Sequence, residues 1–171
     1  MKIALISIEV LIAFAVIWGI CTYNRLIKSK NKTDSSAAAI KACLMKRYSL
    51  ITRLIDLTKG YSRHEKETLV DVINARKMFN GGTPNTFISA LEEKYPELKA
   101  NENFTNLSQQ LVAIESELFR TREDHNKLAL SFNNSIMTFP VSLFARLCGF
   151  HAVEYVEDNG ADLSDSAFDK F

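Results

Sequence analysis

The chain has 171 residues, of which 47% are hydrophobic and 24% are charged, and its formal net charge is +1. This composition excludes a disordered or collagen-like chain, and the small net charge gives no overall field that would recruit nucleic acid. Cys21, Cys43 and Cys148 show neither a CxxC motif nor metal-ligand spacing, so we expect buried, reduced thiols rather than a disulfide framework.

The first predicted element is a membrane-spanning helix. Residues 3–23 are apolar, and the exceptions are Ser7, Glu9 and Thr22. About 20 helical residues are enough to cross a hydrocarbon core of roughly 30 Å. Trp18 and Tyr23 lie toward the C-terminal end of this segment, where aromatic rings favour the headgroup region.

Two alternatives to a retained anchor are a cleaved signal peptide and a lipoprotein. A signal peptide has a shorter apolar core with a small-residue cleavage site outside it, whereas the AxA motif of this segment, at 13–15, lies in the middle of the apolar run. A lipoprotein would be cleaved before Cys21, but the preceding residue is Ile20 rather than a small one. The retained anchor therefore fits best.

The charges that flank the apolar segment predict its orientation. Only Lys2 precedes it, whereas Arg25, Lys28, Lys30 and Lys32 follow it. Because cytoplasmic flanks are enriched in Lys and Arg, we expect the N-terminus outside the cell and the following domain in the cytoplasm. We also expect the four bases that follow the segment to contact anionic lipid headgroups.

Glu9 is the one charged residue inside the predicted span. A carboxylate at the bilayer centre costs roughly 2.5 kcal/mol or more, so it often marks a functional contact. Glu9 also lies only about two helical turns from the N-terminus, within reach of water and headgroups. Two interpretations stay open: an interfacial or protonated bystander, and a helix–helix or lipid contact inside an assembly.

Helix signals dominate the part of the chain after the anchor. Residues 31–59 are rich in Ala, Lys, Leu and Ile, and the apolar residues repeat along one face, which predicts a long helix. This helix either begins with Asp34 as its N-cap or continues directly from the anchor. Gly60 is expected to end it in the left-handed conformation that glycine adopts at little cost.

Two shorter helices are predicted next. A capping box at 62–65 opens the first of them, and the Asn-Gly-Gly sequence at 80–82 ends it. Thr83 as N-cap and Pro84 at the first helical position then open a second short helix, which is expected to end near 95–96.

The clearest pattern is an apolar stripe that predicts a long helix over 104–136. Its members recur in alternating steps of three and four: Phe104, Leu107, Leu111, Ile114, Leu118, Thr121, His125, Leu128, Phe132 and Ser135. Such spacing keeps one face of a helix toward a partner. The opposite face is polar, with Gln109, Glu117, Arg120, Glu123 and Lys127.

The ends of this helix also carry local signals. Asn101 and Asn103 are candidate N-caps, and Phe139 is expected to close the stripe at the end opposite Phe104. After Pro140, residues 141–147 predict a short apolar helix capped by Gly149.

No strand pattern of useful length is present, so the predicted fold class is all-α. Helices joined by short turns lie antiparallel to bury their apolar faces. We therefore expect an anchor at 1–23, an elongated antiparallel helical bundle at 24–156 and an acidic, flexible tail at 157–171. An exposed end of the stripe is a natural place for self-association.

Several short sequences occur together in a distinctive order. The most specific is Tyr-Pro-Glu-Leu-Lys-Ala-Asn-Glu-Asn-Phe at 95–104, and others lie at 46–51, 59–65 and 139–150. Over residues 23–157 the chain resembles the LemA family of bacterial membrane proteins. The resemblance implies a single-pass inner-membrane protein with an antiparallel helical bundle, and it implies little about activity. Because some relatives are associated with specialised bacterial membranes, it favours a membrane-organising role.

The chain departs from the family pattern at a few positions. Ser49 replaces a usual Asp, Thr52 and Arg53 replace a usual Pro-Asn pair, and His125 replaces a usual Tyr. Because proline breaks or kinks a helix, its absence predicts a more continuous first helix here.

Motifs for catalysis or metal binding are incomplete in this sequence. His64 begins a zinc-protease-like sequence, but Thr68 stands where the second histidine is required. His125 occupies a stripe position and is expected to be a hydrogen-bonded core residue. Glu115 and Glu123 lie about 12 Å apart along a helix, which suits surface ion pairs better than paired acid–base catalysis. No catalytic residue, metal site or cofactor is therefore predicted.

These features together predict a non-catalytic scaffold that self-associates at the bacterial inner membrane and organises membrane or partner proteins. An alternative is a regulatory adaptor that binds a membrane enzyme or transporter through its helical bundle or acidic tail. The expected partners are the lipid bilayer, other copies of the chain and a membrane protein of unknown identity, with no nucleic acid.

Overall fold

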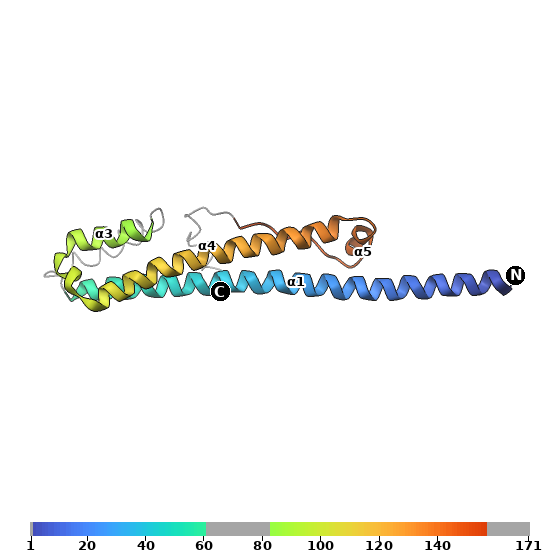
Figure 1. The fold of residues 1–171 in the computed structure, drawn as a ribbon, viewed down its shortest axis with the longest axis horizontal. Coiled ribbons are helices and arrows are strands. Elements are labelled where there is room, and N and C mark those ends of the chain that lie inside the picture. Colours follow the sequence, from blue (N-terminus) through green and yellow to red (C-terminus); the bar gives the residue numbers. More distant parts are fainter. Residues whose placement is uncertain (1, 61–82, 157–171) are drawn as a thin grey trace. The chain divides into compact units, whose positions relative to one another are not determined.

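The computed structural model describes residues 2–60 and 83–156. In these ranges every regular element is a helix, which confirms the predicted all-α class. The elements are α1 (Lys2–Lys59), α3 (Pro84–Lys94), the 3₁₀ helix η1 (Pro96–Ala100), α4 (Glu102–Met137) and α5 (Val141–Leu147) (Figure 1). The helix predicted from the capping box at 62–65 and the predicted tail at 157–171 lie outside the described residues.

Helix α1 runs without a break from the apolar segment through residue 59. Direct continuation from the anchor is therefore correct, and Asp34 is an exposed residue inside the helix rather than its cap. Continuity is favoured because residues 2–59 contain no proline and a single glycine, Gly19. Gly60 follows the helix but does not have the predicted left-handed φ. Its N–H instead donates to the Leu57 carbonyl at 3.3 Å, a 3₁₀-type closure that needs no left-handed residue.

Helix α3 begins and ends where the sequence predicts. The Thr86 N–H donates to Thr83 Oγ1 at 3.4 Å, and Pro84 occupies the first turn. Tyr95 leaves the helical region with φ −129° and ψ 79°, as a residue before proline tends to do.

The short helix η1 was not predicted, and it places Leu98 in the core with no exposed surface. It leads directly into α4, whose N-cap is Asn101. The Asn101 side chain accepts a hydrogen bond from the Phe104 N–H at 3.1 Å, which satisfies one of the unpaired donors of the first turn. Asn103, the other candidate cap, is exposed inside the helix.

The chain divides into two compact units, and each contains part of α1 and part of α4. Unit 1 comprises residues 1–39 and 122–156, and unit 2 comprises residues 40–121 and 157–171.

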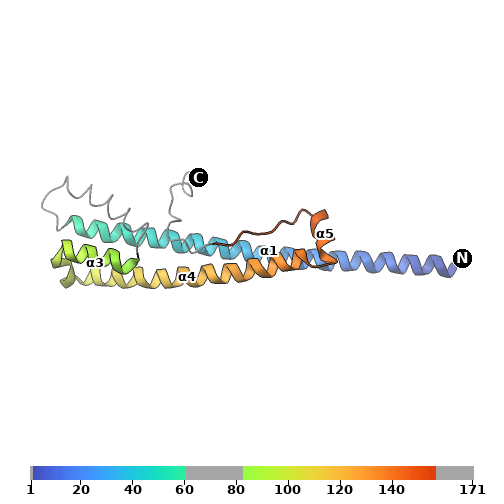
Figure 2. The ribbon, with the colours of Figure 1, turned by 90° about the horizontal axis from the view of Figure 1, so that it is seen from above.

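In unit 1 the two long helices lie antiparallel (Figures 1 and 2). Ser36 of α1 contacts His125 of α4, and Leu26, nearer the N-terminus, packs with Phe132, nearer the C-terminus. Helix α5 turns by 97° from α4. The core of this unit consists of Leu26, Phe132, Ile136 and Ala145, with Val141, Phe150 and Val153 packed against it.

In unit 2 the helices are also antiparallel, and two ion pairs define their register. Arg47 Nε lies 3.0 Å from Glu115 Oε2, and Lys46 Nζ lies 4.0 Å from Glu117 Oε2. The buried hydrophobic residues of this unit are Ile40, Cys43, Leu50, Ile51, Leu54, Ile55, Phe87, Leu91, Leu98, Phe104, Leu111, Ile114 and Leu118.

The buried face of α4 shifts around the helix along its length. Up to Leu118 the buried hydrophobic residues are those of the predicted stripe. Farther along, His125 and Phe132 of the stripe stay buried, Thr121, Leu128 and Ser135 are only partly buried, and residues one position after the stripe become buried as well: Arg122, Ala129, Asn133 and Ile136. An α-helix with 3.6 residues per turn drifts by about 20° per heptad from a 3.5-residue repeat. The stripe therefore describes the start of α4 better than its end.

Two predictions about exposure are wrong. Phe139 does not close the core stripe, because it lies at the corner where the chain turns from α4 into α5, and 75% of its surface is exposed. Of the three cysteines, only Cys43 is buried, whereas Cys21 and Cys148 are exposed free thiols. Cys21 lines an open groove between α1 and α4, and Cys148 lies just past the end of α5. Gly149 has φ 74° and ends α5 as predicted.

Candidate membrane-contact site

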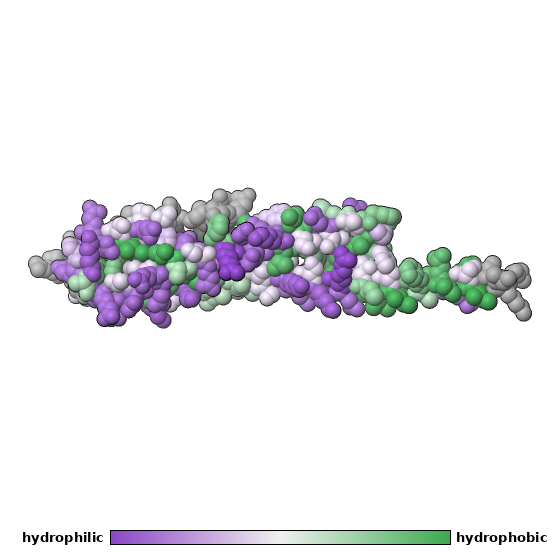
Figure 3. Space-filling view, viewed as in Figure 1, coloured by the Kyte–Doolittle hydropathy of each residue, from purple (hydrophilic) through white to green (hydrophobic). Residues whose placement is uncertain are grey.

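The first part of α1 presents an apolar surface. Between Ile6 and Ile20 its large aliphatic side chains and Phe14 are exposed. Figure 3 shows this surface as predominantly hydrophobic. By length and composition the helix can cross a membrane. Glu9 lies on this exposed surface, a position compatible with either interpretation of its role.

Three of the four bases that follow the apolar segment share one face of α1. Arg25, Lys28 and Lys32 line a groove of about 620 Å³ together with Ser131 and Ser135 of α4. Ammonium, guanidinium and hydroxyl groups are all hydrogen-bond donors, so this groove has the chemistry to bind phosphate oxygens.

Lys30 is exposed but does not line this groove. Two residues along a helix correspond to about 200° of rotation, so Lys30 points away from the side that carries Lys28. The structure therefore brings together three of the predicted headgroup contacts and separates the fourth.

Helix α5 packs against α1 at the end of the apolar segment. The rings of Trp18 and Phe144 meet edge to face with centroids 6.1 Å apart. Gly19 lies directly beneath the same ring, since a Cβ there would be 3.5 Å from Phe144 Cε2. Tyr23 packs against Phe150 in the same way at 5.9 Å. The two aromatic residues predicted to mark the membrane boundary thus also hold α5 and the following segment.

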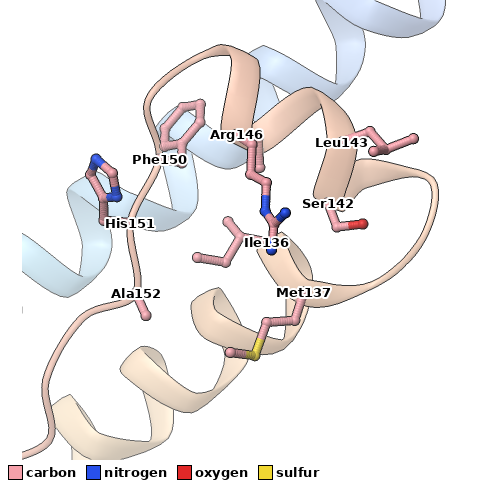
Figure 4. Close-up of a pocket in the computed structure, with 9 residues that line it drawn as sticks. Ile136, Met137, Ser142, Leu143, Arg146, Phe150, His151 and Ala152 are labelled. Carbon is pink, nitrogen blue, oxygen red and sulfur yellow. The ribbon is translucent and has the colours of Figure 1, made fainter.

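A cavity of about 430 Å³ lies beside α5. Its apolar lining comes from Ile136 and Met137 at the end of α4 and from Leu143 of α5, as Figure 4 shows. Arg146 adds a cation to this lining. The cavity is therefore mainly apolar, with one guanidinium able to meet an anionic group.

Two asparagines, which the sequence analysis missed, attach the segment after α5 to α4. The Asn133 amide donates to the Val153 carbonyl at 2.9 Å and accepts from the Val153 N–H at 2.8 Å. Asn126 makes the same pair of hydrogen bonds with Val156, both at 2.9 Å. The signal in the sequence is two asparagines seven residues apart, a spacing that puts both on one side of the helix.

His125 is a buried, hydrogen-bonded residue, as predicted. Its Nδ1 lies 2.9 Å from Ser36 Oγ, and the Ser36 hydroxyl donates to the Thr33 carbonyl at 2.7 Å. Because that hydroxyl has one hydrogen, His125 Nδ1 must be the donor in the Ser36 contact. Among the described residues no group of three or more His, Cys, Asp or Glu is placed to hold a metal ion.

The two glutamates considered for catalysis form separate ion pairs, and the pair of Glu123 lies at the surface as predicted, whereas that of Glu115 does not. Glu115 pairs with the buried Arg47. Glu123 accepts a 2.7 Å hydrogen bond from the Lys127 ammonium, and this bond, together with the positive charge, holds the pKa of the Glu123 carboxyl below its ordinary value.

The predicted stripe lies within the chain's own core. Phe104, Leu111, Ile114, Leu118 and Phe132 are buried, and Leu107 and Leu128 are partly buried. Any assembly of several copies therefore needs additional surface.

Comparison with known proteins finds a family match over most of the chain. The family model described as the LemA family matches residues 36–167. The match begins later and ends later than the resemblance seen at 23–157. It thus excludes the apolar segment and includes most of the acidic end of the chain.

Individual relatives cover smaller parts of the chain. Protein LemA of Metamycoplasma hominis is 28% identical over 131 residues, which are 68% of this chain and 60% of that protein. Magnetosome protein MamQ of Magnetospirillum gryphiswaldense and magnetosome protein MamQ 1 of Paramagnetospirillum magneticum are each 29% identical over 84 residues, which are 48% of this chain and 31% of theirs. The chain thus spans less than two thirds of each of these relatives. Since the family model covers more than half of it, the chain belongs to the LemA family.

Proposed function

We propose that the protein is a non-catalytic scaffold that α1 anchors in a bacterial inner membrane, where it self-associates and organises membrane or partner proteins. The observation that carries this proposal is the continuity of α1, since the apolar segment and the bundle share one helix from Lys2 to Lys59. A continuous helix transmits position and orientation from the membrane to the bundle, whereas a flexible linker does not. The relatives named as magnetosome proteins support a membrane-associated role.

The proposed topology places the N-terminus outside and the bundle in the cytoplasm. Its support is the charge difference across the apolar segment, with Lys2 before it and four bases after it. Arg25, Lys28 and Lys32 line a groove that begins about two helical turns beyond Trp18 and extends to about four turns beyond it, on the side of the anionic headgroups of the cytoplasmic leaflet.

Self-association requires an exposed surface, and unit 2 provides an apolar one. Met45 and Tyr48 of α1 and Val112 and Phe119 of α4 are exposed. Met45 and Tyr48 lie on one side of α1, and Val112 and Phe119 lie on one side of α4, because of their spacing. At about 100° per residue, Tyr48 lies about 160° around α1 from Lys46, and Val112 and Phe119 lie about 140° and 160° around α4 from Glu117, so these three point away from the Lys46–Glu117 ion pair, and Met45 is next to Tyr48. We call these four residues the unit 2 patch and propose that it contacts a second copy.

Self-association is tested by the mass of the full-length protein in mild detergent at micromolar concentration. We expect an oligomer for the natural sequence and a shift toward monomer for Phe119→Glu, since losing the burial of one Phe weakens association by about tenfold or more. Leu130→Glu is the matched control, because Leu130 is an exposed apolar residue of α4 outside the patch, and it should leave the mass unchanged. A natural sequence that is strictly monomeric would remove self-association from the proposal.

A regulatory adaptor is the second candidate, with the acidic C-terminal segment as its recognition element. After residue 156 the chain carries Glu157, Asp158, Asp162, Asp165 and Asp169 against a single base, Lys170. The family match reaches residue 167 and includes most of this segment, which favours a role for it. Deleting the residues after Glu157 should abolish co-purification of a membrane enzyme or transporter. If the truncated protein retains the same partners, the adaptor function is wrong.

A further inference from the structure

The corner between α4 and α5 exposes large apolar side chains. The exposed fractions are 70% for Met137, 75% for Phe139, 60% for Leu143 and 86% for Leu147. Leu143 and Leu147 are four residues apart and therefore share one face of α5. The other face of the same helix is covered, with Ala145 buried in the unit 1 core. We call these four exposed residues the α5 corner.

The α5 corner lies beside the membrane anchor. Phe144 in the middle of α5 contacts Trp18 and packs over Gly19 of α1. These positions are the end of the exposed apolar surface of α1, and tryptophan favours the boundary between acyl chains and headgroups. The corner is therefore held at the depth of this boundary.

Helix α5 also has the orientation of an interfacial helix. In unit 1 the helices α1 and α4 are antiparallel (Figures 1 and 2), and α5 is turned by 97° from α4. A helix that lies across the axis of a membrane-spanning helix lies in the plane of the membrane surface, as interfacial helices do.

The length of the apolar segment requires the membrane to reach the level of α5. If the bilayer ended before Trp18, only residues 3–17 would lie in hydrocarbon, and they span about 22 Å. A bilayer core is roughly 30 Å thick. Trp18 and Gly19 must therefore lie inside the membrane boundary, and so must the part of α5 that packs on them.

The charges around the corner fit a headgroup region. Arg146 is exposed on α5 and lines the cavity shown in Figure 4. An arginine beside exposed leucines can bury its aliphatic stem while its guanidinium reaches lipid phosphates. Arg25 and Lys28 follow about two and three turns beyond Trp18 on α1, so cations lie on the headgroup side of the apolar residues.

We propose that the α5 corner is a second membrane-contact element that inserts into the leaflet on the domain side. Met137, Phe139, Leu143 and Leu147 occupy the boundary of the acyl chains, and Arg146 binds lipid phosphate. This element fixes how deeply α1 inserts and prevents α1 from rotating about its axis. The inference rests on the proposed crossing of the membrane by α1 and adds a contact that the anchor alone does not provide.

The test uses full-length protein with Cys21, Cys43 and Cys148 replaced, reconstituted in phosphatidylcholine–phosphatidylglycerol vesicles. Single cysteines at Leu143→Cys and Leu147→Cys carry an environment-sensitive fluorophore, and spin-labelled lipids serve as quenchers. Leu130→Cys, an exposed position of α4 in the same unit, is the control outside the membrane. Ile12→Cys, in the anchor, is the reference inside it.

We expect lipid quenching at Leu143→Cys and Leu147→Cys that approaches the quenching at Ile12→Cys, with none at Leu130→Cys. Quenching at Ile12→Cys alone would overturn the α5 contact and leave the anchor intact. Absence of quenching at Ile12→Cys would overturn both. Labels at 143 and 147 that are shielded from water but not quenched by lipid would show that a second protein copy covers the corner, which also overturns the proposal.

A second measurement uses the single tryptophan of the chain, Trp18, without any label. In the same vesicles, the double variant Leu143→Gln/Leu147→Gln should raise quenching of Trp18 by aqueous iodide. The reason is that a polar corner no longer holds the part of α1 around Trp18 in the membrane. Leu130→Gln should leave Trp18 quenching unchanged. If the double variant also leaves it unchanged, α5 does not set the insertion depth.

Discussion

Asn133 is a buried side chain whose amide satisfies both backbone groups of Val153. A buried polar group left without its partner costs about 1–3 kcal/mol. We expect Asn133→Ala to lower the free energy of unfolding by that amount and to speed hydrogen exchange at the Val153 amide. Chemical denaturation and amide exchange measure the two effects.

Asn134 provides the control for this prediction. It is the next residue of α4, and it is exposed, so Asn134→Ala should change stability by less than about 0.5 kcal/mol. Equal losses in the two variants would mean that the Asn133 hydrogen bonds do not hold residue 153.

The two ion pairs of unit 2 differ in burial and should differ in their contribution to stability. Arg47 is 6% exposed in its pair with Glu115, whereas Lys46 and Glu117 are both more than half exposed. Removing one partner of a fully buried pair costs about 3–5 kcal/mol and an exposed pair contributes about 0–1. Because Glu115 is about one third exposed, we expect Glu115→Gln to destabilise by about 1–2 kcal/mol.

Glu117→Gln should cost less than about 0.5 kcal/mol in the same denaturation experiment, because water already solvates that pair. A larger loss for Glu117→Gln than for Glu115→Gln would contradict the assigned burial.

At the scale of elements, the continuity of α1 between the anchor and the bundle is the feature that a single residue can break. Ser35 is exposed in the middle of the helix. A proline there removes a backbone hydrogen bond and clashes with the preceding turn, at a cost of about 3 kcal/mol or more. We expect Ser35→Pro to lower stability by at least that amount, and Ser35→Ala to be neutral or slightly stabilising. A Ser35→Pro protein as stable as the natural one would show that α1 is not a continuous helix at this point.

The elements that the sequence predicts well are those whose signals are local. Helix caps are such signals, because each one acts within one turn of the residue itself. The N-cap roles of Thr83 and Asn101 and the helix-ending role of Gly149 therefore follow from residue type. Asp34 is different, because the same residue suits a helix N-cap or an exposed helical position, and only the absence of a break in α1 decides between them.

Features that depend on distant residues were not predictable from the sequence pattern. The exposure of Phe139 depends on the direction in which α5 leaves α4, and the roles of Asn126 and Asn133 depend on a segment 20 to 30 residues away. The drift of the buried face on α4 was predictable in principle, because it follows from 3.6 residues per turn. The candidate membrane-contact site was predicted in part: the bases were identified, but not the separation of Lys30 or the packing of α5 on Trp18.

At the scale of the whole molecule, the account depends on α1 crossing the membrane with the folded domain on the cytoplasmic side. This topology gives three features an environment that suits each of them. The apolar surface of α1 lies in the acyl chains, the grouped bases lie on the headgroup side, and the α5 corner lies at the boundary. A freely soluble protein would expose the apolar residues of the first part of α1 to water, which favours aggregation.

The most direct test of this claim is cysteine labelling in intact bacterial cells with a membrane-impermeant maleimide. In the cysteine-free background, Lys2→Cys reports the N-terminal side, and Lys127→Cys reports the exposed surface of α4. We predict that Lys2→Cys is labelled in intact cells and that Lys127→Cys is labelled only after lysis. Labelling of Lys127→Cys in intact cells would contradict the proposed topology, and recovery of the protein in the soluble fraction would contradict the anchor itself.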